Sequence, residues 1–303
     1  MASLMMKKRM TPSQRKNHFW GYLMSAPTVI GLIILNIIPF FYTIYLSFTK
    51  MVGIGKYELQ GLENYKEMLS DPAVYQSILN SAIYSFMVVP VGIFLSLVIA
   101  VLLNNKIKGV AIYRTIYFIP MVVAPAAVAM IWRWLFNADF GLINYLLEKL
   151  GLEGVHWLTN PTTAMLSIAI VGIWSNVGYN MVIILAGLRN IPRMYYEAAQ
   201  IDGASPVRQF FSITLPLVSP SLFFLSITRL IAALSEFDLV FMMIDEANPA
   251  KNALKTIMYL YYENAFIYNE KSYASAIVVL VFAIIMVITA IQFVMQKKWV
   301  HYE

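Results

Sequence analysis

The chain has 303 residues, of which 60% are hydrophobic and 13% charged, and its formal net charge is +6. Soluble domains carry about a quarter charged residues, so this composition favours a membrane protein. The absence of cysteine excludes disulfides and thiolate metal sites, and the three histidines have no partner at metal-ligand spacing. No metal site is therefore predicted. In a membrane protein the placement of positive charge matters more than its total, so no nucleic-acid partner is predicted either.

Six apolar segments are long enough to cross the bilayer's hydrocarbon core, which is about 30 Å thick. A segment in lipid must satisfy its backbone hydrogen bonds internally, so each is predicted to be a helix and the fold class to be all-α, a polytopic membrane protein. The first is too long for the apolar core of a signal peptide and is expected to be retained. The predicted spans are 22–48, 79–103, 114–136, 162–188, 217–243 and 274–295, forming a membrane domain at 22–296 with tails at 1–21 and 297–303.

Lysine and arginine concentrate in the two tails and in the links after spans two and four. They are Lys7, Lys8, Arg9, Arg15, Lys16, Lys106, Lys108, Arg114, Arg189, Arg193, Arg208, Lys297 and Lys298. The positive-inside rule places these segments in the cytoplasm, including both termini and the stretch 189–216. Three longer loops, 49–78, 137–161 and 244–273, then lie outside. They are either a docking face or plain solvated connectors.

Prolines are expected to interrupt two spans. Pro120 and Pro125 lie within the third, and Pro216 and Pro220 at the start of the fifth. Arg133, between two tryptophans, is interpreted as an anchor at the membrane interface whose charged head reaches water. The loop Gly53-Ile-Gly-Lys-Tyr57 lacks the Ser or Thr that follows Gly-Lys in phosphate-binding loops, so this chain is not expected to hydrolyse ATP by itself.

The fourth span carries Trp174, Asn176, Tyr179 and Asn180 within one to two helical turns. Polar groups in the membrane need partners, because an unpaired one is costly. One interpretation is that they join neighbouring helices. The other is a pocket for a polyhydroxylated solute, since amides bind hydroxyls and aromatic faces stack on sugar rings.

The fifth span contains Arg229 and Glu236, seven residues apart and therefore on one helix face. An ionisable residue inside the membrane is a functional hypothesis by default. If Arg229 faces a central cavity, it favours a substrate with a carboxylate, sulfate or phosphate. The alternative is a structural pair between Arg229 and a carboxylate on this or a neighbouring helix.

The stretch 189–216 is predicted to contain two short cytoplasmic elements. Pro192 opens the first, which continues to Ile201, and Gly203 permits the left-handed turn that ends it. Ser205 suits the N-cap of the second element and Pro206 its first helical position. A short amphipathic helix beneath six spans is either a docking piece for a partner or a membrane-surface helix.

This stretch also matches a pattern without a gap: Glu197-Ala198-Ala199, three residues, Gly203, nine residues, Ile213, one residue, Leu215-Pro216. It resembles the EAA loop of binding-protein-dependent ABC importer permeases. The likeness to the carbohydrate-uptake branch, of the maltose-permease-F or glycerol-phosphate-permease-A type, extends over nearly the whole chain. It includes Pro39–Phe48, Tyr113–Thr115, Phe118–Pro120, Ile131–Asn137, Gly141–Asn144 and Phe237-Asp238.

The resemblance implies a type I ABC importer permease fold and a transport subunit rather than an enzyme. It implies a second related permease, two ATPase subunits of one or two kinds, and a solute-binding protein outside. ATP and magnesium would be held by the ATPases, with no cofactor in this chain. The location would be the cytoplasmic (inner) membrane of a bacterium or archaeon, in contact with lipid. The residues implied in ATPase coupling are Tyr196, Glu197, Ala198, Ala199, Asp202, Gly203, Ile213, Leu215 and Pro216.

The substrate implied is a sugar or oligosaccharide, and the candidates for its path are Trp174, Asn176, Tyr179, Asn180, Arg229 and Glu236. Two departures from the family stand out. Residues 244–249 replace a Gly-rich segment, and Arg229 is unusual for a neutral-sugar permease, which favours an acidic or modified saccharide. The alternatives are a non-sugar solute such as a glycerol phosphodiester, or a membrane-embedded glycan or lipid enzyme. An enzyme would need clustered carboxylates or histidines, and the sequence offers only scattered ones.

Overall fold

The computed structural model describes residues 12–53, 55–105 and 108–301. The predictions made for Lys7, Lys8, Arg9 and Lys106 lie outside these ranges. The helices are α1 (Pro12–Leu32), α2 (Ile38–Ser47), α3 (Glu63–Ser70), α4 (Pro72–Asn104), α5 (Val110–Val122), α6 (Pro125–Leu135), α7 (Leu142–Lys149), α8 (Pro161–Asn190), α9 (Arg193–Ile201), α10 (Pro206–Gln209), α11 (Leu215–Leu234), α12 (Asp238–Met243), α13 (Lys251–Leu254), α14 (Ile257–Tyr262) and α15 (Lys271–Trp299). Turns of π-helix cover Ile33–Ile37, Phe210–Thr214 and Glu263–Ile267, and the strands are β1 (Thr49–Gly53) and β2 (Lys56–Leu59).

The all-α prediction is confirmed, and the β1–β2 hairpin is the one sheet among the described residues. Five continuous helical stretches are long and apolar enough to span a membrane. They are Lys16–Ser47, Pro72–Asn104, Pro161–Asn190, Pro206–Leu234 and Lys271–Trp299. Most extend past the apolar segments seen in the sequence, and α1 already begins at Pro12, inside the predicted tail.

The sixth span is the bent pair α5 and α6, whose axes differ by 99°. The bend falls before Pro125, the first residue of α6, and the preceding Ala124 is extended with ψ 133°. A residue before proline is pushed out of the helical region by the proline ring. Pro120, in contrast, lies inside α5 and does not end it. The expected interruption is therefore real at Pro125 only.

The prediction that Pro216 and Pro220 interrupt the fifth span is wrong. A π-helical turn over Phe210–Thr214 joins α10 to α11, so one helix runs from Pro206 to Leu234. The wider turn reroutes backbone hydrogen bonds just ahead of Pro216, which lacks an N–H to give. The break lies instead after Leu234, before α12 begins.

Helices α4 and α8 form the centre of the molecule, and α5 and α11 pack against them. Gly178 of α8 explains how closely α5 approaches. A Cβ atom at this position would stand 1.8 Å from the Tyr117 carbonyl oxygen. Only a residue without a side chain allows the two backbones to cross there.

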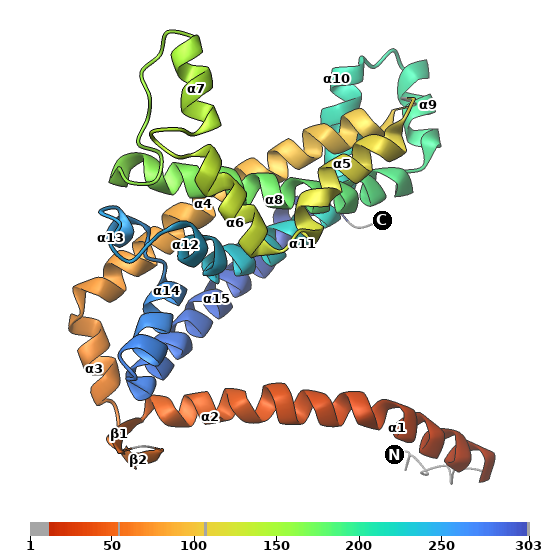
Figure 1. Ribbon diagram of the computed structural model, residues 1–303. Helices are drawn as coiled ribbons and strands as arrows, with labels where there is room; N and C mark the ends of the chain where they lie inside the picture. The colour runs from red at the N-terminus through yellow and green to blue at the C-terminus, as the bar shows by residue number, and fades with distance from the viewer. Residues whose placement is uncertain (1–11, 54, 106–107, 302–303) are drawn as a thin grey trace.

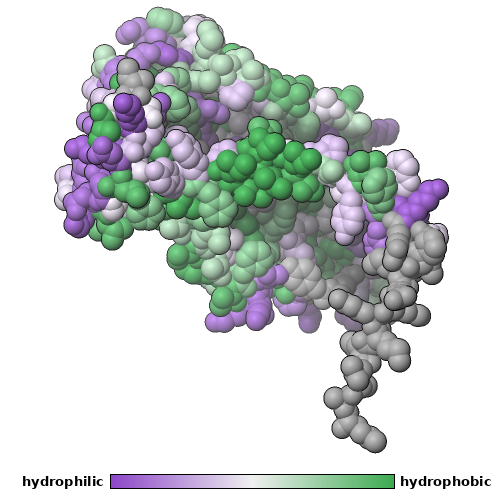
Figure 2. Space-filling model, turned by 90° about the horizontal axis from the view of Figure 1, so that it is seen from below, coloured by the Kyte–Doolittle hydropathy of each residue, from purple (hydrophilic) through white to green (hydrophobic). Residues whose placement is uncertain are grey.

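The elements gather at two ends (Figure 1). Helices α9 and α10 lie at the same end as the start of α1 and the C-terminus, while the hairpin, α3, α7 and α13 lie toward the opposite end. Helices α1 and α2 stand apart from the body along most of their length, and between residues 16 and 47 only Leu46 and Ser47 are buried. In Figure 2 hydrophobic residues crowd the middle of the molecule, and hydrophilic ones gather toward its ends.

Candidate functional site

A small polar cavity lies where α4, α8 and α11 meet. Its volume is about 30 Å³, room for one or two water molecules. Its polar lining comes from segments far apart in the sequence: Tyr84, Asn176, Asn180, Arg229 and Glu236. The rest of the lining is apolar or glycine.

Arg229 is held in the cavity by neutral groups. Its Nη1 donates to Asn176 Oδ1 at 2.5 Å, and Asn176 Nδ2 donates in turn to the Gly172 carbonyl at 2.8 Å. The guanidinium carbon lies 4.3 Å from the centre of the Tyr179 ring, a cation–π contact. The Arg229 Nε is buried and has no hydrogen-bond partner in the described part of the chain. Asn176 therefore both joins helices and orients the charged residue.

Glu236 lines the same cavity but is engaged elsewhere. Its Oε1 accepts from the backbone N–H of Leu239 at 3.0 Å, in the first turn of α12, and its carboxylate accepts from the Tyr84 hydroxyl. Within the described residues no ion pair connects it to Arg229. The structural pair considered from the sequence is therefore not formed in this conformation.

Two of the remaining path candidates differ sharply in their surroundings. Asn180 is 2% exposed and lines the cavity, and no described residue provides a hydrogen-bond partner for its Oδ1. Trp174 is 43% exposed and lies edge-on to Trp132, with the ring centres 5.5 Å apart. It borders a separate apolar groove of about 950 Å³ between α4, α5 and α8. The structure thus separates Trp174 from the polar cavity.

Tyr84 was not singled out from the sequence. It is 1% exposed on α4, and its hydroxyl approaches Gly172 of α8, where an added Cβ would lie 2.4 Å away. In the sequence, Tyr84 is simply a tyrosine within an apolar span, and nothing near it indicates which helix it contacts. Its role depends on a contact with α8 and Glu236 that no local pattern encodes.

The stretch 189–216, which follows α8, folds into the two short helices that the sequence predicts. Helix α9 ends at Ile201, and Gly203, two residues later, has a left-handed φ of +75°. The Ala204 N–H donates to the Ala199 carbonyl at 2.8 Å, and the Gly203 N–H to that of Gln200 at 3.0 Å, the pattern of a Schellman motif. Ser205 then caps α10 by accepting from the Arg208 N–H, and Pro206 follows at the first helical position.

The residues of this loop fall into two sets. The inner set packs on the helix bundle: Tyr196, Ile213 and Leu215 contact the core, and the Tyr196 hydroxyl lies 2.9 Å from Thr214 Oγ1. The outer set is exposed to solvent and consists of Glu197, Ala198, Asp202 and Gly203. Ala199 and Pro216 are half-buried.

Helix α9 has no buried residue and presents apolar side chains to solvent, with Met194 67% and Ile201 87% exposed. An apolar surface of this kind in water is typical of an interface with another protein.

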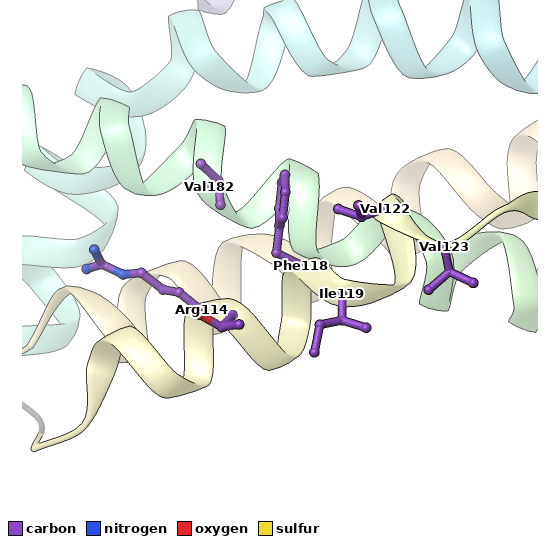
Figure 3. A pocket seen from close by; sticks show the side chains of 7 residues that line it. Arg114, Phe118, Ile119, Val122, Val123 and Val182 are labelled. Atoms are coloured by element: carbon purple, nitrogen blue, oxygen red, sulfur yellow. The ribbon is translucent and has the colours of Figure 1, made fainter.

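A second groove, of about 610 Å³, follows α5 and α8 (Figure 3). Its walls are mainly apolar, with Phe118, Ile119 and Val122 from α5 and Val182 from α8. Arg114 stands at one end of the row, with its side chain directed away from the apolar residues. Among the described residues its Nε and Nη2 have no hydrogen-bond partner.

Ion pairs fasten the opposite end of the molecule. The fully buried Glu263 pairs with Lys251 at 2.6 Å and Lys255 at 2.5 Å, and Lys251 also pairs with the exposed Glu246. Arg133, expected only as an interface anchor, pairs with Asp245 at 2.5 Å and so ties α6 to the segment after α12. The loop 244–273 is thus packed onto the bundle.

Sequence relatives cover nearly the whole chain. The probable ABC transporter permease protein YesP of Bacillus subtilis is 38% identical, over 100% of this chain and 97% of that protein. The sulfoquinovosyl glycerol transport system permease protein SmoG of Agrobacterium fabrum is 34% identical, over 89% and 87%.

A solved structure shares the fold. A chain of a bacterial alginate ABC transporter, in complex with an alginate pentasaccharide-bound periplasmic protein, superposes with a TM-score of 0.83 at 21% identity, over 93% of this chain and 96% of that one. Residues 72–301, which carry both the polar cavity and the α9 loop, match the family described as binding-protein-dependent transport system inner membrane component. This chain belongs to that family and is a multi-pass membrane component of an ABC transport system.

Proposed function

We propose that the chain is the permease subunit of an ATP-driven importer for a sugar or oligosaccharide. The observation that carries the proposal is α9, a short helix without a buried residue that carries the Glu-Ala-Ala–Gly pattern at the end rich in Lys and Arg. A helix with exposed Met194 and Ile201 is suited to bury these side chains in a groove of a partner. That partner is an ATPase subunit, which supplies ATP and magnesium.

The backbone offers a direct route from α9 to the polar cavity. Tyr196 contacts Thr214, and the helix that carries Thr214 runs without a break from Pro206 to Leu234, with Arg229 in its last two turns. A displacement of α9 by the ATPase would therefore move the helix that carries Arg229. This coupling suits alternating access, in which nucleotide inside and loaded binding protein outside each favour one state.

A second permease would complete the molecule. Residues 16–47 form a long apolar helix that stands apart from the body, and the groove lined by α5 is mainly apolar and open. Two related permeases would cover such surfaces and enclose a path between them. In this arrangement both termini and α9 are cytoplasmic, following the distribution of Lys and Arg, and the outer loops face the solute-binding protein.

The carbohydrate assignment rests on the site and on a relative. The cavity combines amide and phenol groups, which bind hydroxyls. SmoG, with 34% identity, is named for the transport of sulfoquinovosyl glycerol. The substrate class we propose is accordingly a saccharide.

Co-expression with candidate ATPases and a second permease, followed by purification and an ATPase assay, tests this function. Glu197→Lys in exposed α9 should prevent assembly or uncouple hydrolysis from uptake. Glu148→Lys, the same charge change on α7 at the opposite end, should leave assembly intact. Stable purification without any nucleotide-binding partner would refute the proposal.

A further inference from the structure

Arg229 carries a charge that the protein itself does not neutralise. Arginine stays protonated in proteins, and a charge within a transmembrane segment is costly unless it is paired. The ion pairs formed by the described residues do not include Arg229. Its contacts are the neutral Asn176 amide and the face of Tyr179.

The unused polar groups point to a ligand. Arg229 and Asn180 both line the cavity, and within the described residues Arg229 Nε and Asn180 Oδ1 have no hydrogen-bond partner. Asn180 is only 2% exposed. A buried polar atom without a partner costs free energy. A ligand that binds in this cavity during another step of the transport cycle would provide partners for both atoms.

The nearby carboxylate of Glu236 does not neutralise the charge of Arg229. Glu236 already accepts from the Leu239 N–H and from the Tyr84 hydroxyl, and this holds it at the start of α12. The guanidinium therefore remains available to an external anion.

We propose that Arg229 binds an acidic group on the transported solute: a carboxylate, sulfonate or phosphate carried by a saccharide. This inference rests on the proposed import function and names its substrate class. Guanidinium donors match such groups in a bidentate geometry. The cavity of about 30 Å³ admits only water in the present conformation. The acidic group enters the cavity when the path widens, and Asn180 accepts from a neighbouring hydroxyl.

The test is equilibrium binding to the purified complex of full-length chains, without solute-binding protein. The probes are D-galacturonate and D-galactose, which differ by one carboxylate. The wild-type complex should bind galacturonate about tenfold or more tightly than galactose, the expected scale of a charge-assisted hydrogen-bond pair. Arg229→Gln should remove the difference and Arg229→Lys should restore part of it. Arg133→Gln, the same change at an ion-paired outer arginine, should preserve it.

Other outcomes overturn the inference. A wild-type complex with no preference for galacturonate does so, as does an Arg229→Gln variant that weakens the binding of both sugars by the same factor and so keeps the difference between them. Restoration of a lowered melting temperature of Arg229→Gln by Glu236→Gln also overturns it, because this would reveal a structural pair. ATPase assembly and ATP hydrolysis are measured on the same preparations. Intact assembly without anion preference refutes only this inference, whereas failure to assemble refutes the proposed function.

Discussion

At the scale of single residues, one side chain can serve two purposes that the sequence presents as alternatives. Asn176 was compatible with a contact between helices or with a solute pocket. In the structure its amide N–H donates within α8 while its oxygen accepts from Arg229 of α11. The interhelical bond is itself what orients the charged group in the cavity.

Gly203 offers a test of the loop at this scale. Its φ is +75°, and the space around it is open, so an added methyl would cause backbone strain without a clash. Gly203→Ala should destabilise the end of α9 by about 1 kcal/mol, and Gly203→Asn by less. Faster amide exchange in α9 and weaker coupling of ATP hydrolysis to uptake would reveal this destabilisation.

Gly21→Ala, in the open part of α1, is the control. If Gly21→Ala and Gly203→Ala had equal effects, the explanation by backbone strain at Gly203 would be contradicted.

Glu263 offers a test of the ion-pair cluster that it forms with Lys251 and Lys255. Glu263→Gln would leave Lys251 and Lys255 short of a buried carboxylate, and breaking a buried pair costs about 3–5 kcal/mol. Thermal unfolding in detergent should show a large drop for this variant and little change for Glu246→Gln, whose side chain is 71% exposed. Similar drops in melting temperature for both variants would show that the buried ion pairs of Glu263 make no special contribution to stability.

The same cluster predicts how stability depends on pH. Burial opposes the charge of Lys251, but the carboxylates of Glu246 and Glu263 outweigh it and raise the pKa of this lysine above 10.5. A group whose pKa is higher in the folded than in the unfolded protein stabilises the fold fully at pH values below its unfolded pKa. This stabilisation is lost as the pH rises through its folded pKa. The contribution of Lys251 should therefore be constant near neutral pH and decline only in strong alkali. In Lys251→Met that alkaline decline should be smaller.

At the scale of elements, the prolines of the fifth span show how local rules can be outweighed. Pro216 and Pro220 were expected to break the helix, yet it continues through a π-helical turn over Phe210–Thr214. The actual break after Leu234 contains no proline. It is held by Glu236, which accepts from the first turn of α12 and from Tyr84 on α4.

The contact between α5 and α8 provides a test at this scale. Gly178→Ala would place a methyl group against the Tyr117 carbonyl, and overpacking of this kind costs about 1–3 kcal/mol. The melting temperature and the yield of folded protein should both fall. Gly31→Ala, also helical but with no atom within 4 Å of the added Cβ, should leave both unchanged. A fully stable Gly178→Ala variant would be incompatible with this close approach.

At the scale of the whole molecule, the long N-terminal helix contacts little of the rest of the chain. Phe40 meets Phe282 of α15 with ring centres 5.1 Å apart, but most of residues 16–47 is exposed. Lipid covers part of such a surface, and a second permease is proposed to cover the rest.

Cysteine labelling can check this surface, because the chain has no cysteine of its own. Leu35→Cys, at a position 73% exposed, should react readily with a membrane-permeant maleimide in the isolated chain. Its labelling should fall severalfold when the second permease is co-expressed. Leu150→Cys, 76% exposed next to α7, should remain reactive in both preparations. Unchanged labelling at Leu35 would argue against coverage by a partner.

Features that depend on neighbouring residues could be predicted from the amino-acid sequence. The length of the apolar runs predicted the spans, and Gly203, Ser205 and Pro206 predicted the ends of α9 and α10, because hydrophobicity and capping act within a few residues. Which polar side chains meet, in contrast, became visible only in the folded molecule. Tyr84, Asn180 and Arg229 come from three helices, and their meeting depends on how each helix is rotated and packed. An apolar span that can face either lipid or protein carries no local signal for that rotation.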